Sequence, residues 1–256
     1  MPKNKLYINS SDRSSGTSSN FRFDLNHPIQ NVIAVSLGRV SLSNTFYGIN
    51  EHNQTLTWLE SSTSLTTTLD LGNYPVGDDD TDADPIGFLY LLKTAMDGVS
   101  AADGGSKTYE VSYDRPTALI SISTSDGTSL TITKNQPLSQ VLGITVDKTD
   151  TLIVGDRQLN LSPDPNIYIE TSLPIVSRVG NQKRSVISQF NMDGAFAGYS
   201  SQQDWETGFD VSSMSPTTIS HIDLRLVDHQ GNILNNRGFE WSCQFYYETL
   251  DDTQAS

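Results

Sequence analysis

The stretch FEWSCQFYYE, residues 239–248, carries the clearest structural signal in this 256-residue sequence. Large apolar residues occupy every second position: Phe239, Trp241, Cys243, Phe245 and Tyr247. A period of two predicts a β-strand with one buried face, because successive side chains of a strand point to opposite sides of the sheet. We therefore expect a core strand in which Phe239, Trp241, Cys243 and Phe245 face inward, with Cys243 as core filler.

The segment before this strand predicts its antiparallel partner. Apolar residues alternate again at Ile222, Leu224 and Leu226. The turn-forming sequence DHQGN, residues 228–232, follows and separates the two runs. Together they indicate an antiparallel pair at the end of the chain.

A second strand-rich region lies near the start of the chain. Phe21, Phe23 and Leu25 alternate with polar residues, and further alternation follows at residues 33–42. The apolar positions shift by one residue at Gly38, which predicts a β-bulge there. The Asn-His-Pro sequence at residues 26–28 predicts the end of the first run.

Two helical patterns interrupt the strands, at residues 85–98 and 137–142, and both fall within residues 51–154. The first has helical spacing of its apolar residues, which are Ile86, Leu89, Leu92 and Met96. The sequence thus predicts an all-β dominated protein, a single jelly-roll sandwich of residues 21–50 plus 155–250. Residues 51–154 are expected to be an inserted small α+β module, residues 1–20 an N-terminal arm, and residues 251–256 a C-terminal tail.

The composition excludes several classes of function. The formal net charge is −14, and the 16 Lys and Arg residues are scattered along the chain, so direct nucleic-acid binding is not expected. A single cysteine rules out an intrachain disulfide framework. No segment approaches the ~18 apolar residues of a membrane span. We expect production in a reducing cytosol.

No motif supports a metal site or a cofactor. The acidic cluster Asp78–Asp84 begins like a calcium loop, but Pro85 replaces the required glycine and Leu91 replaces the bidentate glutamate. A solvated loop is the preferred interpretation of this cluster, with cation binding left as the alternative. We expect no metal and no cofactor.

Catalytic patterns are equally weak. His221 and Asp223 lie two residues apart on a predicted strand, but no nucleophile motif accompanies them. Glu206 beside Trp205 and Glu240 beside Trp241 leave a jelly-roll glycoside hydrolase as an alternative. We expect no enzyme.

The ends and the centre of the chain resemble known proteins. The patterns are YINSSDR at residues 7–13, FRFDL at 21–25, SNTFYGIN at 43–50, LGNY at 71–74, YEVSYD at 109–114, LGI at 142–144, LRLVDHQGN at 224–232 and FEWS at 239–242. At both ends the sequence is similar to penton (minor capsid) proteins of virophages, polinton-like viruses and related double-jelly-roll DNA viruses, and the central stretches resemble a pattern of viral capsid, penton and fibre-like modules.

The resemblance implies a structural virion protein. It implies a homopentamer at each fivefold vertex of an icosahedral DNA virus capsid, next to a double-jelly-roll major capsid protein. The protein would be located in the virion, at a capsid vertex, after synthesis in the host cytosol or a viral factory. The alternative is the receptor- or carbohydrate-binding head of a viral fibre, although the chain has no repetitive stalk.

The polar run YINSSDRSSGTSS, residues 7–19, raises a separate expectation. Such a composition buries too little apolar area to pack by itself. We expect an assembly arm that is mobile in an isolated subunit and ordered on a neighbouring one. Tyr7, Ile8 and Arg13 are its expected contact residues.

Overall fold

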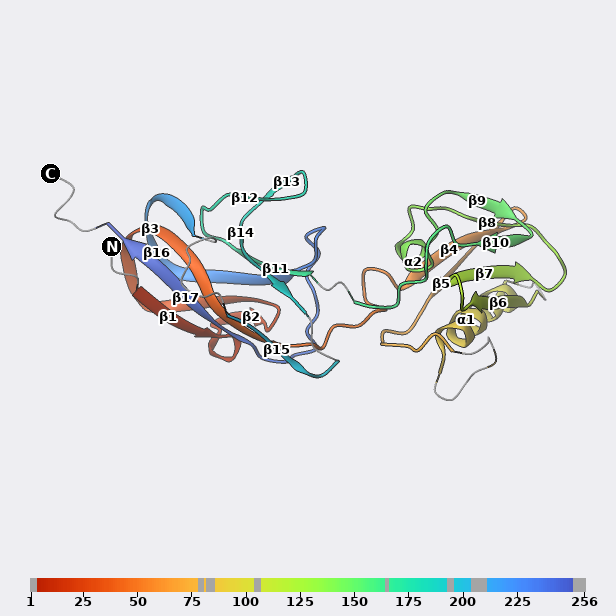
Figure 1. Ribbon diagram of the computed structural model, residues 1–256, viewed down its shortest axis with the longest axis horizontal. Coiled ribbons are helices and arrows are strands. Elements are labelled where there is room, and N and C mark those ends of the chain that lie inside the picture. Colours follow the sequence, from red (N-terminus) through yellow and green to blue (C-terminus); the bar gives the residue numbers. More distant parts are fainter. Residues whose placement is uncertain are drawn as a thin grey trace. The chain divides into compact units, whose positions relative to one another are not determined.

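The computed structural model describes residues 4–77, 81, 86–103, 107–163, 166–192, 196–203 and 211–250. The aspartates of the 78–84 cluster, the predicted helix start at residues 84–85, Trp205, Glu206 and the predicted tail at 251–256 lie outside the described residues. The chain forms two compact units (Figure 1). Unit 1 comprises Met1–Phe46 and Asp164–Ser256, and unit 2 comprises Tyr47–Pro163.

The unit boundaries differ by several residues from the predicted ones at 50/51 and 154/155. Ile49 exchanges both backbone hydrogen bonds with Gly72 and is buried in the core of unit 2. The amides of Leu159 and Asn160 donate to the carbonyls of Ala118 and Val141. Backbone pairing over long sequence separations, which local patterns do not reveal, thus adds residues 47–50 and 155–163 to unit 2.

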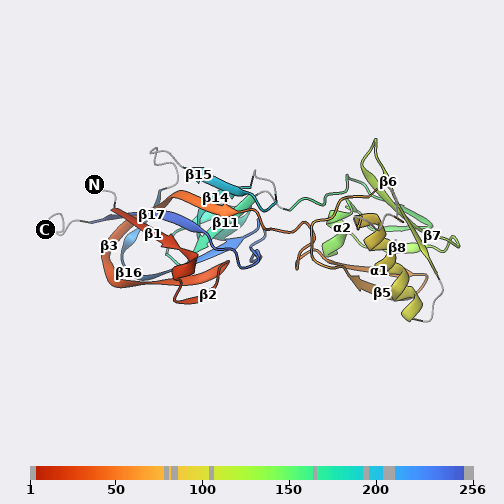
Figure 2. The same ribbon diagram turned by 90° about the horizontal axis from the view of Figure 1, so that it is seen from below.

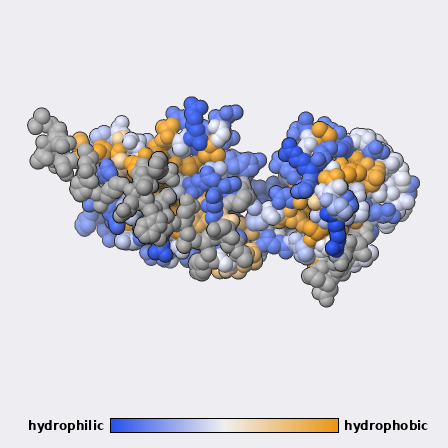
Figure 3. Space-filling model, in the orientation of Figure 1, coloured by the Kyte–Doolittle hydropathy of each residue, from blue (hydrophilic) through white to orange (hydrophobic). Residues whose placement is uncertain are grey.

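Unit 1 is built on an eight-stranded antiparallel sheet. Its strands are β1 (Asn4–Asn9), β2 (Ser15–Thr17), β3 (Asn20–Ser43), β11 (Asn166–Thr171), β14 (Val186–Asn191), β15 (Tyr199–Gln203), β16 (Ser212–Val227) and β17 (Ser242–Thr249). The order is β1-β17-β3-β16-β11-β14, and β2 and β15 also pair with β3. The hairpin β12 (Ser177–Val179) and β13 (Gln182–Arg184) stands apart as a two-stranded sheet, and Figure 3 shows hydrophilic side chains gathered over it.

The long strand β3 curls the sheet into a jelly-roll sandwich (Figure 2). Its first half pairs with β2 and β16, and its second half with β17 and β15. The expected break at residues 26–28 does not occur. Repeated register shifts between β3 and β16 around Pro28 accommodate the missing N–H, so the strand bends there and continues.

The predicted core strand is correct for three of its four residues. Trp241, Cys243 and Phe245 are at most 4% exposed and face the unit 1 core, where Phe21 and Ile8 also lie. Phe239 is 51% exposed, so its predicted burial is wrong. β17 begins at Ser242, and Phe239 follows the left-handed residues Arg237 and Gly238, where the strand alternation no longer applies.

The bulge predicted at Gly38 is confirmed. Arg39 pairs with Gln244 and Leu37 with Phe245, which leaves Gly38 as the extra residue of β3. The Tyr246 ring covers this glycine, and a Cβ added there would lie 1.8 Å from the Tyr246 Cε2 atom. The ammonium of Lys5 lies 5.4 Å from the centroid of the same ring.

Replacement of Gly38 by alanine is therefore expected to lower the free energy of unfolding by about 1–3 kcal/mol, because the Tyr246 ring must leave its position. Chemical denaturation measures the change. Gly98→Ala is the control, since nothing lies within 4 Å of a Cβ there and its helical position favours alanine. A further Tyr246→Ala change should remove the penalty at Gly38; an unchanged penalty would contradict the proposed clash.

Unit 2 is the small α+β insertion. One sheet has the order β5-β4-β8-β9 and a second has the order β10-β7-β6. Its elements are β4 (Thr55–Glu60), β5 (Thr63–Thr68), α1 (Phe88–Ala102), β6 (Tyr109–Asp114), β7 (Leu119–Thr124), β8 (Leu130–Ile132), α2 (Pro137–Val141), β9 (Lys148–Asp150) and β10 (Leu152–Val154). The protein is thus all-β dominated, with a small helical insertion.

Helix α1 lies against β6 and β5 (Figure 1). Leu89, Leu92 and Met96 are fully buried on its inner face, as their spacing predicted. Ile86 is 50% exposed, because the helix begins at Phe88 with Gly87 as its N-cap and leaves Ile86 outside the helical face. No helix of the described part of the chain is both long and apolar enough to cross a lipid bilayer.

Candidate assembly site

The polar N-terminal segment belongs to the sheet of unit 1. β1 pairs antiparallel with β17, with Ile8 opposite Cys243 and Tyr7 opposite Gln244. Ile8 is 1% exposed, whereas Tyr7 on the opposite face is 67% exposed. The expectation of a separate arm at residues 1–20 does not agree with this arrangement, because strand pairing occupies the backbone of residues 4–9 and the core takes up Ile8.

The turn after β1 is fixed to the start of β17. Residues Ser10–Asp12 form a single 3₁₀ turn, and Ser10 is completely buried. Its amide donates to the Trp241 carbonyl at 2.9 Å, and the Trp241 amide donates to the Ser10 Oγ at 2.9 Å. The Ser10 hydroxyl in turn donates to the Glu240 carboxylate. Ser10 therefore connects this turn to Trp241 and Glu240 together.

Arg13 is also held within the subunit. Its Nη1 donates to the Ser10 carbonyl at 2.6 Å and to the Glu240 Oε1 at 2.8 Å. The hydrogen bond from Ser10, together with Arg13, holds the pKa of Glu240 below its ordinary value. A carboxyl that is ionised at neutral pH has no proton to donate, so Glu240 is poorly suited to be the general acid of a glycosidase.

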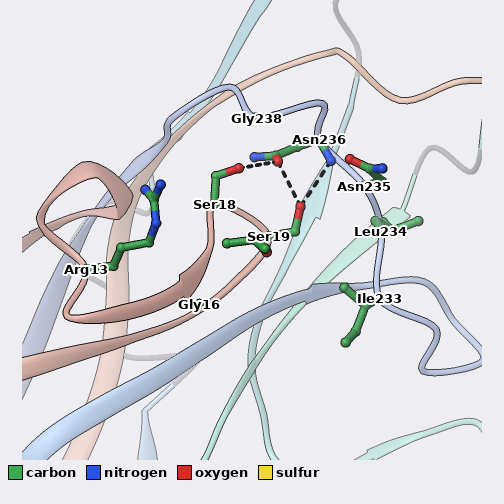
Figure 4. A pocket seen from close by; sticks show the side chains of 10 residues that line it. Arg13, Gly16, Ser18, Ser19, Ile233, Leu234, Asn235, Asn236 and Gly238 are labelled. Atoms are coloured by element: carbon green, nitrogen blue, oxygen red, sulfur yellow. Dashed lines mark hydrogen bonds between the residues drawn. The ribbon is translucent and has the colours of Figure 1, made fainter.

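Asn236 is the centre of a second network, shown in Figure 4. The hydroxyls of Ser18 and Ser19 donate to its Oδ1 at 2.6 and 2.8 Å, and its backbone N–H donates to the Ser19 Oγ at 3.0 Å. The Trp241 indole Nε1 donates to the Ser18 carbonyl at 2.7 Å. All of these residues are buried. The serines of the polar run thus satisfy buried polar groups of the loop before β17, which explains a polar composition at this place.

A pocket of about 480 Å³ lies between the polar run at residues 13–19 and the loop at residues 233–238. Its lining consists of Arg13, Gly16, Thr17, Ser18, Ser19, Ile233, Leu234, Asn235, Asn236 and Gly238 (Figure 4). Ile233 in the lining is 41% exposed, and Phe239, one residue after Gly238, is 51% exposed. Exposed apolar side chains surrounded by polar groups are typical of protein interfaces, which have an apolar centre and a polar rim.

β1 also offers its backbone for association. It is the outermost strand at one end of the sheet order, so among the described strands only β17 pairs with it. An edge strand presents a row of backbone donors and acceptors to which another chain can add. We name β1, Tyr7, Ile233, Phe239 and the pocket of Figure 4 the N-terminal face.

The structure separates the three residues that the sequence grouped as contact residues. Tyr7 points outward, while Ile8 and Arg13 have partners inside unit 1. Asn236 was missed by the sequence reasoning. The sequence NNRG at residues 235–238 signals a turn, but no local signal identifies Ser18 and Ser19 as its partners.

The His221 and Asp223 side chains, considered above as a catalytic pattern, make other contacts. The Asp223 carboxylate pairs with the Arg22 guanidinium at 2.8 Å, and the His221 Nδ1 lies 3.2 Å from the Ser220 Oγ. Burial raises the pKa of the Cys243 thiol to about 12, so no reactive thiolate forms there at neutral pH. Among the described residues, no group of three or more His, Cys, Asp or Glu side chains is placed to hold a metal ion.

Comparisons with known proteins find a distant structural likeness but no sequence match. No family model matches the chain, and no curated protein sequence matches it. A crystal structure of the selenomethionine-labelled mavirus penton protein is similar to 97% of this chain over 100% of its own length. The TM-score is 0.47 and the sequence identity is 10%. At this level the likeness is a distant structural match.

Proposed function

We propose that this chain is a structural capsid protein, the penton subunit at the fivefold vertices of an icosahedral DNA virus. Two features support the proposal. The sequence resembles penton proteins at both ends, and the residues of its first pattern, Tyr7–Arg13, form the edge strand and turn of the N-terminal face. The observation that carries the proposal is this edge strand with its 67% exposed Tyr7.

The N-terminal face is the proposed contact between neighbouring copies. A ring of five repeats one heterologous contact, in which a surface of one subunit meets a different surface of the next. An edge strand with an exposed aromatic side chain suits such a contact, because aromatic residues are enriched in the energetically important part of interfaces. The outer partner of the ring is proposed to be a double-jelly-roll major capsid protein, which places the chain in the virion.

The subunit number tests the proposal. The chain has a mass of 28.1 kDa, and native mass spectrometry of the purified protein, or of capsid vertices, is expected to give five times this mass. A species of three copies would contradict the proposal and favour a fibre head. Incorporation of the chain at vertices, traced in an image of purified particles, is the corresponding test in the virion.

Replacement of Tyr7 by serine is expected to weaken the ring by about tenfold or more in its dissociation constant, because an exposed aromatic anchor is lost. The melting temperature of the isolated Tyr7→Ser subunit should stay unchanged, since the Tyr7 side chain faces solvent. Analytical ultracentrifugation measures the first effect and calorimetry the second.

Val146→Ser is the matched control for this variant. Val146 is a 49% exposed apolar residue of unit 2, outside the N-terminal face, and its replacement should not change the dissociation constant. Equal weakening by both variants would show that Tyr7 has no special part in assembly.

A further inference from the structure

A second pocket, with a mainly polar lining, lies in unit 1 next to the pocket of Figure 4, and Gly16 lines both. Its volume is about 500 Å³, within the range of small-molecule sites. The lining comes from the β2 hairpin, β3, the end of β11 and β16, and consists of Ser15, Gly16, Asn20, Phe21, Arg22, Ser172, Asp223 and Arg225. Gly16 has φ +95°, and a Cβ there would lie 2.2 Å from the Asn20 carbonyl oxygen, so the hairpin that forms one wall requires glycine.

Ion pairs link the charges of this pocket to Glu170 and Arg184, in a row across the four strands β3, β16, β11 and β13. Arg22 donates through Nε and Nη2 to the two carboxylate oxygens of Asp223, at 2.8 and 3.1 Å. Glu170 on β11 uses one oxygen for Arg184, at 2.5 Å, and the other for the Arg225 Nη2, at 3.1 Å. Of these charged groups, Arg22, Arg225 and Asp223 line the pocket itself, two guanidinium groups against one carboxylate, in a protein whose formal net charge is −14.

Two cations of the row, Arg22 and Arg225, are more exposed than its anions. The side chains of Arg22 and Arg225 are each 46% exposed, whereas those of Asp223 and Glu170 are 28% and 8% exposed. The Nη1 of Arg22, and the Nε and Nη1 of Arg225, make no hydrogen bond within the described residues. The side chains of Ser15 and Asn20 also have no hydrogen-bond partner there. Several free donors thus line the same pocket.

The pocket also offers acceptors. The partly exposed carboxylate of Asp223 stays ionised, because its hydrogen bond with Arg22 lowers its pKa. A purely anionic group would meet repulsion from this carboxylate, whereas hydroxyl groups would donate to it. A ligand that carries one carboxylate and several hydroxyls satisfies both sets of groups.

We propose that this pocket binds a carboxylated sugar, with the carboxylate at Arg225 and Arg22 and the hydroxyls at Asp223, Asn20 and Ser15. The bidentate donor geometry of arginine suits a carboxylate. The proposed site shares Gly16 with the pocket of the N-terminal face, but its charged groups Arg22, Asp223 and Arg225 do not line that pocket, and the proposal holds whatever the number of subunits. It assigns to the virion protein a means of recognising acidic glycans.

Titration calorimetry or NMR with the methyl glycoside of glucuronic acid tests the proposal, with methyl glucoside and acetate as comparison ligands. We expect a dissociation constant on the order of 1 mM for the glucuronide, because a ligand with so few atoms can gain only a limited binding free energy. Methyl glucoside lacks the carboxylate and acetate lacks the hydroxyls, so both should bind at least about tenfold more weakly.

Arg225→Gln should weaken glucuronide binding about tenfold, because a charged bidentate contact is lost. Arg39→Gln, at an exposed arginine of β3 outside the pocket, should leave binding unchanged, and equal melting temperatures would show that both variants are folded. Each of three results would overturn the proposal. The glucuronide does not bind, acetate or methyl glucoside binds equally well, or the Arg225→Gln variant keeps the affinity of the original protein.

Discussion

Removal of residues 2–19 is expected to destabilise unit 1 severely, by on the order of 5 kcal/mol. The deletion takes away Ile8 from the core, where it is 1% exposed. It also leaves the buried groups of Asn236 and the Trp241 indole without Ser18 and Ser19. Unsatisfied buried polar groups add to the loss of apolar burial, so the combined effect should exceed that of any single substitution considered above.

Hydrogen exchange provides the measurement. The amides of β17 that pair with β1 should lose protection in the truncated protein, and the thermal transition of unit 1 should move to much lower temperature or lose its cooperativity. Ile8→Ala is a milder version of the same test, with an expected loss of about 2–5 kcal/mol. A truncated protein with unchanged melting would restore the interpretation of residues 1–20 as a mobile arm.

Replacement of Trp241 by alanine has the second largest expected effect, a loss of about 3–5 kcal/mol in the free energy of unfolding. The indole is 3% exposed and packs edge-to-face on Phe21, with a distance of 5.7 Å between the ring centroids. Its Nε1 donates to the Ser18 carbonyl at 2.7 Å. The variant leaves a cavity in the core and a buried carbonyl without its donor.

Phe239→Ala is the matched control for Trp241→Ala. Both positions are aromatic and belong to the same predicted alternation, but Phe239 is 51% exposed. Its replacement should change the stability of the isolated subunit by less than about 1 kcal/mol. Chemical denaturation of the two variants compares them directly. Similar losses in both would mean that Phe239 is buried in solution.

Period-two patterning predicted the central strands well. The inward side chains of β17 and β16, such as Cys243, Phe245 and Leu224, are buried as expected. The helical spacing of Leu89, Leu92 and Met96 identified the inner face of α1. These features are local, because the period of a strand or helix appears within ten to fifteen residues of sequence.

The same reasoning failed where a local pattern extended beyond its element. Phe239 continues the alternation of β17 in the sequence, yet it lies in a loop set by two left-handed residues. Pro28 marks a strand end in the sequence, yet β3 continues because the irregular pairing with β16 accommodates it. In both cases the partner segment, and not the local sequence, decides where the strand begins or ends.

The sequence by itself determined the fold class, the presence of an inserted α+β unit, the bulge at Gly38 and the burial of Trp241, because each follows from periodicity or from a conformational preference of nearby residues. Only the tertiary structure decided that the polar N-terminal segment is part of the sheet. Ser10, Ser18 and Ser19 find their partners Trp241 and Asn236 more than 200 residues further along the chain. The row of arginines and carboxylates likewise joins residues of β3, β11 and β16. Composition predicts disorder for a polar segment that must pack by itself, whereas buried polar groups elsewhere in the fold supply the hydrogen bonds that order this one.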